Sequence, residues 1–383
     1  MKQIAIVIII FSCAIGIITV ALKQASSVVD TESLLGIDLG GDDSDSQRVQ
    51  SFDLFVSTDK GNEFEPARHF SNSPDIQNKP RFTHKVNDIE YFVDLYGNSI
   101  VLIATDAGIF ASTDQGIQWE EVFQDYIRGP VYDIAIDDTK SVASLVIAGT
   151  NGHGEGAIFV SVSGGNSFLE SFVTAQRDDP VMSVVYDEYN KNTVYAITKN
   201  GLFLTSADSG HSWDSRQATV IAGAVDRMVL YPHRNVRSTT LFVVAEDGLY
   251  RSTTSGETWQ SLNNGLVAYP GAITIHDIHI SEEFSPLYIG TDYGLLVSNN
   301  AGNSFQQVSF LVPYGTEPVT AVAIHPRDSA IIYAGIGKKV YVTENGGQSW
   351  RVHTVPNGTD TMDFIFVHPF NSSVILIASS RGV

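Results

Sequence analysis

Acidic, aromatic and histidine side chains gather near the starts of several β-rich segments, and their types could bind or transform a ligand. When these segments are aligned by their ends, Tyr132 and Asp133 fall in one, His276 and Asp277 in a second, and Asp363 in a third. Carboxylates that converge on one opening focus a negative potential, which favours a basic peptide or a cationic protein surface. The alternative is that each aspartate bonds the backbone of a neighbouring sheet. On the first interpretation all five residues are candidate ligand contacts.

Other catalytic and metal chemistries have weaker support. Two carboxylates could hydrolyse a glycoside, but they would need a separation of about 5–9.5 Å, which a sequence does not reveal. His276 and His279 lie three residues apart, so on a regular strand they point to opposite faces and cannot chelate one metal without a bulge. The one cysteine, Cys13, lies in the apolar N-terminus, which excludes disulfides and thiol nucleophiles elsewhere. We expect no metal and no cofactor.

Composition limits the class of partner. The 43 acidic and 23 basic residues give a net charge of −20, which repels phosphate backbones, so nucleic acid is not expected. Hydrophobic residues make up 43% of the chain and charged residues 17%, which is enough to bury a large core. The chain is therefore expected to be globular and to bind a protein or an extended ligand.

The N-terminus is predicted to direct export. Residues 4–22 carry no charge and are flanked by Lys2 and Lys23, and such a run is about long enough to span a bilayer as a helix. We interpret residues 1–25 as a signal or membrane anchor and residues 26–50, rich in Asp, Ser and Gly, as an acidic flexible linker. The remainder is then expected on the extracytoplasmic side, periplasmic or extracellular, either anchored or secreted if the signal is cleaved.

Seven copies of an eight-residue pattern dominate residues 51–383. Each copy has Ser or Thr first, Asp, Asn, Ser or Thr third, Gly fifth, and Trp or Phe eighth. The glycines are spaced 45 to 55 residues apart, at Gly61, Gly116, Gly165, Gly210, Gly256, Gly302 and Gly347. The polar side chains can bond backbone N–H groups of a tight turn, glycine supplies a positive φ, and the aromatic residue packs between sheets.

Four strands per repeat predict an all-β, seven-bladed β-propeller with four-stranded antiparallel blades. An apolar strand precedes each turn, and in every repeat but the first two more lie upstream, as in residues 131–136 and 145–149. The first turn has only one strand before it, at 52–56, whereas two strands at 362–367 and 374–378 follow the last repeat. These ends complete each other, so we expect one composite blade to close the ring by joining N- and C-terminal strands.

The repeat resembles the Asp-box (BNR) repeat of sialidases, xyloglucanase-type glycosidases, sortilin-like receptors and photosystem II assembly factors. In those families the boxes lie at the periphery, away from any active site. The resemblance therefore implies structural roles for the acidic and amide positions and for the tryptophans. These residues are Asp59, Asp114, Asp208, Asn300, Asn345, Trp119, Trp213, Trp259 and Trp350.

The resemblance implies two functions, and we favour the non-enzymatic one. Sialidases carry an arginine triad and an FRIP-type motif; the motif is missing here, and Arg81, Arg128 and Arg227 fit surface loops as well as a channel. Xyloglucanase-type enzymes use two propellers, and this chain has room for one. We therefore expect an exported, membrane-tethered scaffold or assembly factor that binds a protein or extended ligand. A glycoside hydrolase with carboxylates at the channel mouth is the alternative.

Overall fold

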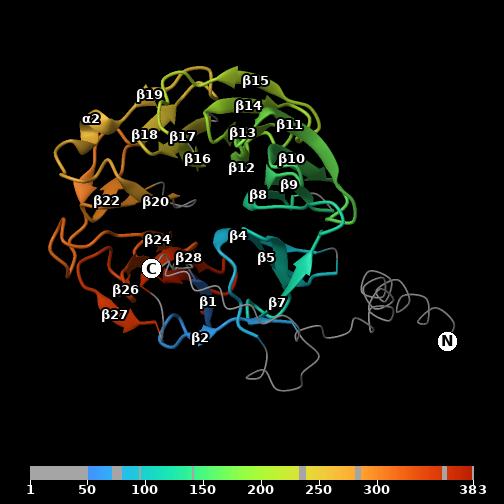
Figure 1. Ribbon diagram of the computed structural model, residues 1–383. Coiled ribbons are helices and arrows are strands. Elements are labelled where there is room, and N and C mark those ends of the chain that lie inside the picture. The colour runs from blue at the N-terminus through green and yellow to red at the C-terminus, as the bar shows by residue number, and fades with distance from the viewer. Residues whose placement is uncertain are drawn as a thin grey trace, which may run out of the picture. The chain divides into compact units, whose positions relative to one another are not determined.

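The structure is a computed structural model that describes residues 51–70, 80–94, 96–139, 142–232, 239–280, 286–355 and 360–381. The predicted anchor at 1–25 and linker at 26–50 lie outside the described residues. The described chain forms seven sheets arranged in a ring, as Figure 1 shows. The predicted seven-bladed, all-β propeller is confirmed.

Blades 1 to 3 follow one another along the chain, and each has a four-stranded antiparallel meander. Blade 1 consists of β4 (Val86–Val93), β5 (Ser99–Thr105), β6 (Gly108–Ser112) and β7 (Gln118–Val122). Blade 2 consists of β8 (Val131–Asp137), β9 (Ser144–Thr150), β10 (Glu155–Ser161) and β11 (Leu169–Arg177). Blade 3 consists of β12 (Val181–Tyr186), β13 (Val194–Thr198), β14 (Leu202–Ser206) and β15 (Asp214–Gln217).

Blades 4 to 6 repeat this order. Blade 4 consists of β16 (Val225–Pro232), β17 (Thr239–Ala245), β18 (Gly248–Ser252) and β19 (Gln260–Ser261). Blade 5 consists of β20 (Ile275–Ile280), β21 (Leu287–Thr291), β22 (Leu295–Ser298) and β23 (Gln306–Gln307). Blade 6 consists of β24 (Ala321–Ile324), β25 (Ile332–Ile336), β26 (Lys339–Thr343) and β27 (Arg351–Thr354). A single-turn helix, α2 (Asn263–Leu266), connects blades 4 and 5, and no described helix is long and apolar enough to cross a membrane.

Blade 7 is the composite blade that the unpaired ends of the sequence predict. It is made from β28 (Thr361–Val367), β29 (Ile375–Arg381), β1 (Ser51–Ser57) and β2 (Glu65–Pro66), in that order. β1 pairs with β29 along its whole length, and β28 then contacts β4, which closes the ring. This pairing joins strands from the two ends of the described chain and leaves no sheet edge at the junction.

One strand departs from the four-stranded pattern. After β2 the chain adds β3 (Arg68–His69), which pairs in parallel with β7 and makes blade 1 five-stranded. Repeat arithmetic could not foresee β3, because two residues leave no periodic signal. The strand joins blade 7 to the outer edge of blade 1.

The seven repeat turns share one hydrogen-bond pattern. In each turn the hydroxyl of the first residue accepts the N–H of the fifth-position glycine at 2.8–3.0 Å. The third residue accepts the N–H four residues later at 2.9–3.1 Å. Ser163, Thr254, Asn300 and Asn345 make this second bond as well as Asp59 does, so the position needs an acceptor and not an acid.

The repeat glycines satisfy two demands at once. Gly256 has a φ of +82°, and a Cβ at this position would lie 2.0 Å from Phe203 in the preceding blade. The residue before the glycine is also left-handed, as at Ala301 with φ +54°. Six of the seven turns are thus both sharply bent and packed on the preceding blade or the connection that leaves it, whereas Gly61 contacts Ile375 of its own blade. The sequence pattern indicated only the bend.

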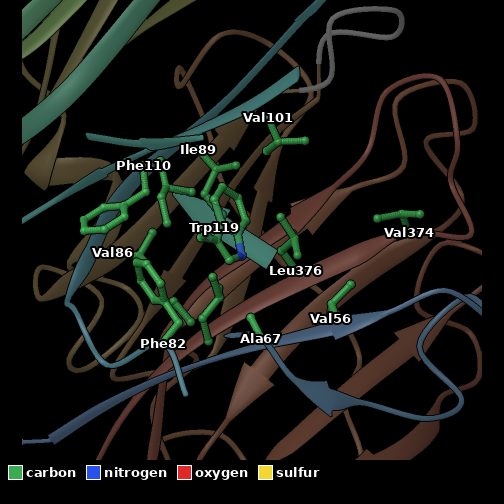
Figure 2. Packing of buried hydrophobic residues seen from close by; sticks show 13 residues of the cluster. Val56, Ala67, Phe82, Val86, Ile89, Val101, Phe110, Trp119, Val374 and Leu376 are labelled. Atoms are coloured by element: carbon green, nitrogen blue, oxygen red, sulfur yellow. The ribbon is translucent and has the colours of Figure 1, made fainter. Parts of the chain in front are cut away.

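The core lies between neighbouring blades. Figure 2 shows the cluster between blades 7 and 1, where Trp119, 1% exposed, packs among Leu376, Ala67 and other apolar side chains. The other three repeat tryptophans, Trp213, Trp259 and Trp350, are only half-buried. Trp213 packs against the core between blades 2 and 3, and its indole N–H donates to Ser171 at 3.0 Å. The expectation that these tryptophans are all core residues is therefore correct for Trp119 and too strong for the others.

Candidate ligand-binding channel

The inner strands of all seven blades line a central cavity of about 1130 Å³. Because every blade is built in the same order, the inner strands all begin at one end of this channel and end at the other. We call these ends the strand-start mouth and the strand-end mouth. This volume is slightly above the range of about 300–1,000 Å³ for small-ligand sites, so the channel has room for a small ligand or a segment of polypeptide.

A β-bulge marks the strand-start end of six inner strands. In each bulge one residue near the start of the strand has no partner on the next strand, as between Val131 and Asp133 in β8. Bulges re-aim side chains, and here each extra residue lines the channel. In blade 6, Thr320 holds the same place directly before β24. These seven residues form what we call the bulge ring: Asn87, Tyr132, Met182, Asp226, His276, Thr320 and Asp363.

The residues that follow the bulges link one blade to the next, and we call them the inner row: Asp88, Asp133, Ser183, Arg227 and Asp277. Three of them are aspartates that accept a backbone N–H from the next blade. Asp88 accepts from Ile134 at 3.1 Å, Asp133 from Val184 at 2.8 Å and Asp277 from Val322 at 2.7 Å.

Ser183 and Arg227 complete this chain of contacts. The Ser183 hydroxyl bonds Asp133 and also lies 3.0 Å from the carbonyl oxygen of Met228 in blade 4. Arg227 donates to Asp277 at 2.9 Å, where their side chains are 27% and 6% exposed. The inner row therefore connects blades 1 to 6 in sequence, so most of its hydrogen-bonding capacity is used within the fold.

Burial sets the protonation chemistry of the channel. It raises the pKa of Asp88 and of Asp277, and it raises the pKa of Asp133 well above its ordinary value, with the Asp88 carboxylate adding to the effect. Burial and the positive charge of nearby Arg227 lower the pKa of His279 to about 4. The middle of the channel is thus a place where isolated charges are costly and are kept in contact with partners.

Four of the five candidate ligand contacts line the channel near its strand-start mouth, whereas Asp277 is buried and does not line it. Tyr132, His276 and Asp363 belong to the bulge ring, whereas Asp133 and Asp277 belong to the inner row and bond neighbouring blades. The geometry of the last two matches the structural alternative raised from the sequence. Contact between any of the five and a ligand stays a prediction.

The other sequence candidates are only partly brought together. Arg227 lies in the channel, but Arg81 and Arg128 are exposed and outside its lining, so these three do not assemble an arginine triad. The bulge at His276 lets both His276 and His279 line the channel, although the described residues contain no group of three potential metal ligands.

Sequence reasoning missed Asp88 and left open whether Arg227 lies on a surface loop or in the channel. A signal for the inner row was present: an apolar residue, any residue and then a polar one recur at the inner-strand starts, as in residues 86–88, 131–133 and 275–277. This short pattern can be recognised only when the blades are already aligned.

Comparison with known proteins supports the fold. No family model and no curated protein matches the sequence. The solved structure of YCF48 from Cyanidioschyzon merolae is similar, with a TM-score of 0.58, 14% identity, and coverage of 77% of this chain and 95% of that one. YCF48 bound to D1 peptide matches with a TM-score of 0.55, 12% identity, and coverage of 77% and 91%.

A second kind of propeller is similar to the same degree. The extracellular domain of a putative one component system from B. thetaiotaomicron matches with a TM-score of 0.58 and 13% identity. The match covers 83% of this chain and 40% of that one. At such identities the similarity establishes the propeller fold alone.

Proposed function

We propose that this chain is a non-enzymatic binding protein, exported and held at a membrane by residues 1–25, whose channel receives a basic segment of a partner polypeptide at the strand-start mouth. The repeat turns act as Asp-box turns that stabilise the blades. The polypeptide partner, the export of the protein and its membrane tether are proposed together.

The observation that carries the proposal is that the inner row and the bulge ring have different roles at the strand-start mouth. The inner-row aspartates are occupied by the fold: the two oxygens of Asp277 accept bonds from Ile278, Val322 and Arg227. A catalytic carboxylate would need access to substrate, which these contacts oppose. The bulge ring above them carries Asp226 and Asp363 and no lysine or arginine, so the ring as a whole favours a cation.

The similar solved structures are consistent with a role in binding a polypeptide. One of them is YCF48 bound to D1 peptide, so the same ring of blades can present a surface to a peptide.

Capture from a native membrane extract tests the proposal. Full-length protein in mild detergent should retain a polypeptide partner, and rising salt should release it because exposed charges are screened. The double variant Asp226→Asn/Asp363→Asn should retain much less, while Asp114→Asn/Asp208→Asn in the repeat turns should retain as much as the wild type. Hydrolysis of chromogenic glycosides that requires Asp226 or Asp363 would contradict the proposal and identify the glycosidase alternative.

The tether has its own test. Residues 1–25 should keep the protein in the membrane pellet after alkaline extraction, and N-terminal sequencing should find the segment uncleaved. A soluble mature protein that begins after residue 25 would show that the segment is a cleaved signal.

A further inference from the structure

We propose that Tyr132, Met182 and Asp226 form a site for one basic side chain, arginine or lysine, of the partner polypeptide. The inference rests on the proposed function and adds to it the part of the mouth that recognises the ligand and the chemistry that it recognises.

These three residues occupy consecutive places in the bulge ring. They come from blades 2, 3 and 4, whose inner strands β8, β12 and β16 contact one another in that order. Each is the extra residue of a bulge and each lines the channel. Tyr132 and Met182 are half-buried and Asp226 is exposed, so the arc runs from a partly apolar surface to a solvated carboxylate.

The rest of the ring is largely engaged by the protein itself. The Asn87 amide donates to the Val131 carbonyl at 2.7 Å, and His276 is held by Asp292 at 2.7 Å. Asp363 accepts a bond from Ser380 at 3.0 Å, and its charge is partly offset by nearby Lys85. The arc of Tyr132, Met182 and Asp226 is therefore the part of the ring that is most available to a ligand.

The arc suits a basic side chain better than other ligands. A tyrosine ring attracts a cation placed over its face, and a methionine thioether adapts to the aliphatic stem of arginine or lysine. The Asp226 carboxylate then meets the charged head. Arg227 follows Asp226 in the chain and also attracts it, but the Arg227 guanidinium is bound to Asp277 in the inner row and lies over Phe364.

The test uses two blocked pentapeptides that differ in one group: acetyl-Gly-Leu-Arg-Leu-Gly-amide and its citrulline analogue, which keeps the shape of arginine without its charge. Titration calorimetry on the full-length protein should show the arginine peptide binding about tenfold more tightly. Asp226→Asn should remove this difference. Asp125→Asn, an exposed aspartate in the connection between blades 1 and 2, should preserve it. Tyr132→Leu should weaken the arginine peptide more than the citrulline peptide.

The outcomes separate this inference from the proposed function. Equal affinity for the two peptides, no binding of either, or an arginine preference that survives Asp226→Asn would overturn the basic side-chain site. If the partner from the membrane extract were still captured in a salt-sensitive way, the proposed function would stand and another part of the mouth would recognise it. Loss of the arginine preference in an Asp226→Asn protein with an unchanged melting temperature would support the site.

Discussion

Two sets of aspartates stabilise this propeller in opposite ways. Those of the repeat turns lie within the turns, where Asp59 and Asp208 are exposed and Asp114 is half-buried, and each accepts a bond from a residue four positions away. Those of the inner row, such as Asp133 and Asp277, accept backbone N–H groups 51 and 45 residues away, in the next blade. The first set makes hydrogen bonds within one repeat, whereas the hydrogen bonds of the second set form only once the ring is assembled.

Their electrostatics differ accordingly. The Ser212 and Ser206 hydroxyls and a backbone N–H lower the pKa of Asp208 to about 2. Burial raises the pKa of Asp133 and of Asp277. The charged form of the turn acids is therefore stabilised by its hydrogen bonds, whereas burial disfavours the charged form of the inner-row acids.

The largest effect should come from Asp277. In Asp277→Ala the Arg227 guanidinium loses its partner and the N–H groups of Val322 and Ile278 lose their acceptor. We expect the free energy of unfolding to fall by about 3–5 kcal/mol, the range for breaking a buried pair. Chemical denaturation measures this loss. Asp292→Ala, an exposed aspartate of the same blade, is the control and should cost about 1 kcal/mol or less. Similar losses for the two variants would contradict the distinction between inner row and surface.

Asp133 should give an intermediate effect that depends on the replacement. Asp133→Ala strands the Val184 N–H and the Ser183 hydroxyl, which should cost about 1–3 kcal/mol. Asp133→Asn keeps an acceptor oxygen and removes the buried charge, so its unfolding free energy should stay close to that of the wild type. If the two variants were equally destabilised, the link between blades 2 and 3 would depend on the charge and not on the bond.

Asp208→Ala should have a small effect. It removes one turn acceptor at the exposed periphery, so we expect a loss of about 0.5–1.5 kcal/mol in unfolding free energy. Asp208→Asn should restore most of it, since Asn300 and Asn345 do the same work in their turns. A loss in Asp208→Ala as large as that of Asp277→Ala would remove the contrast between the two sets.

The pH dependence of stability should separate the two sets most finely. A raised folded-state pKa, as for Asp133, stabilises fully below the ordinary value of 3.8, and this stabilisation is lost as pH rises through the raised pKa. A lowered pKa, as for Asp208, stabilises above 3.8, and this stabilisation is lost as pH falls toward 2. Denaturation at a series of pH values should therefore show Asp133→Asn altering the curve above 3.8 and Asp208→Asn altering it below. If Asp133→Asn altered the curve only below 3.8 and Asp208→Asn only above it, the two pKa directions would be contradicted.

The parts of the fold that could be predicted are those written locally. The hydroxyl, glycine and aromatic positions of each turn lie within eight residues, so their periodicity predicts the blade count. The incomplete sets of strands at the two ends predict the closure of blade 7. The bulges at Asp226 and His276 could not be predicted, because a bulge depends on register with the next strand. The bonds from Asp88 and Asp133 join residues that only the assembled ring brings together.

The same distinction between local and assembled features applies to the candidate site. Aligning strand ends correctly placed Tyr132, His276 and Asp363 beside the row of Asp133 and Asp277. The alignment could not predict which of the two rows makes hydrogen bonds to the neighbouring blade. The tryptophans show the same dependence on the assembled ring. Trp119 and Trp213 hold equal places in the pattern, but Trp119 is 1% exposed in the cluster between blades 7 and 1, while Trp213 is half-buried.

Covalent labelling of carboxylates tests the central claim, that a ligand meets the bulge ring and not the repeat turns. Full-length protein would be labelled with and without its captured partner, and labelled residues identified by mass spectrometry. The account predicts that labelling of Asp226 falls sharply in the complex while labelling of Asp114 and Asp208 is unchanged. Unchanged labelling of Asp226 together with protection of the repeat-turn aspartates would contradict it.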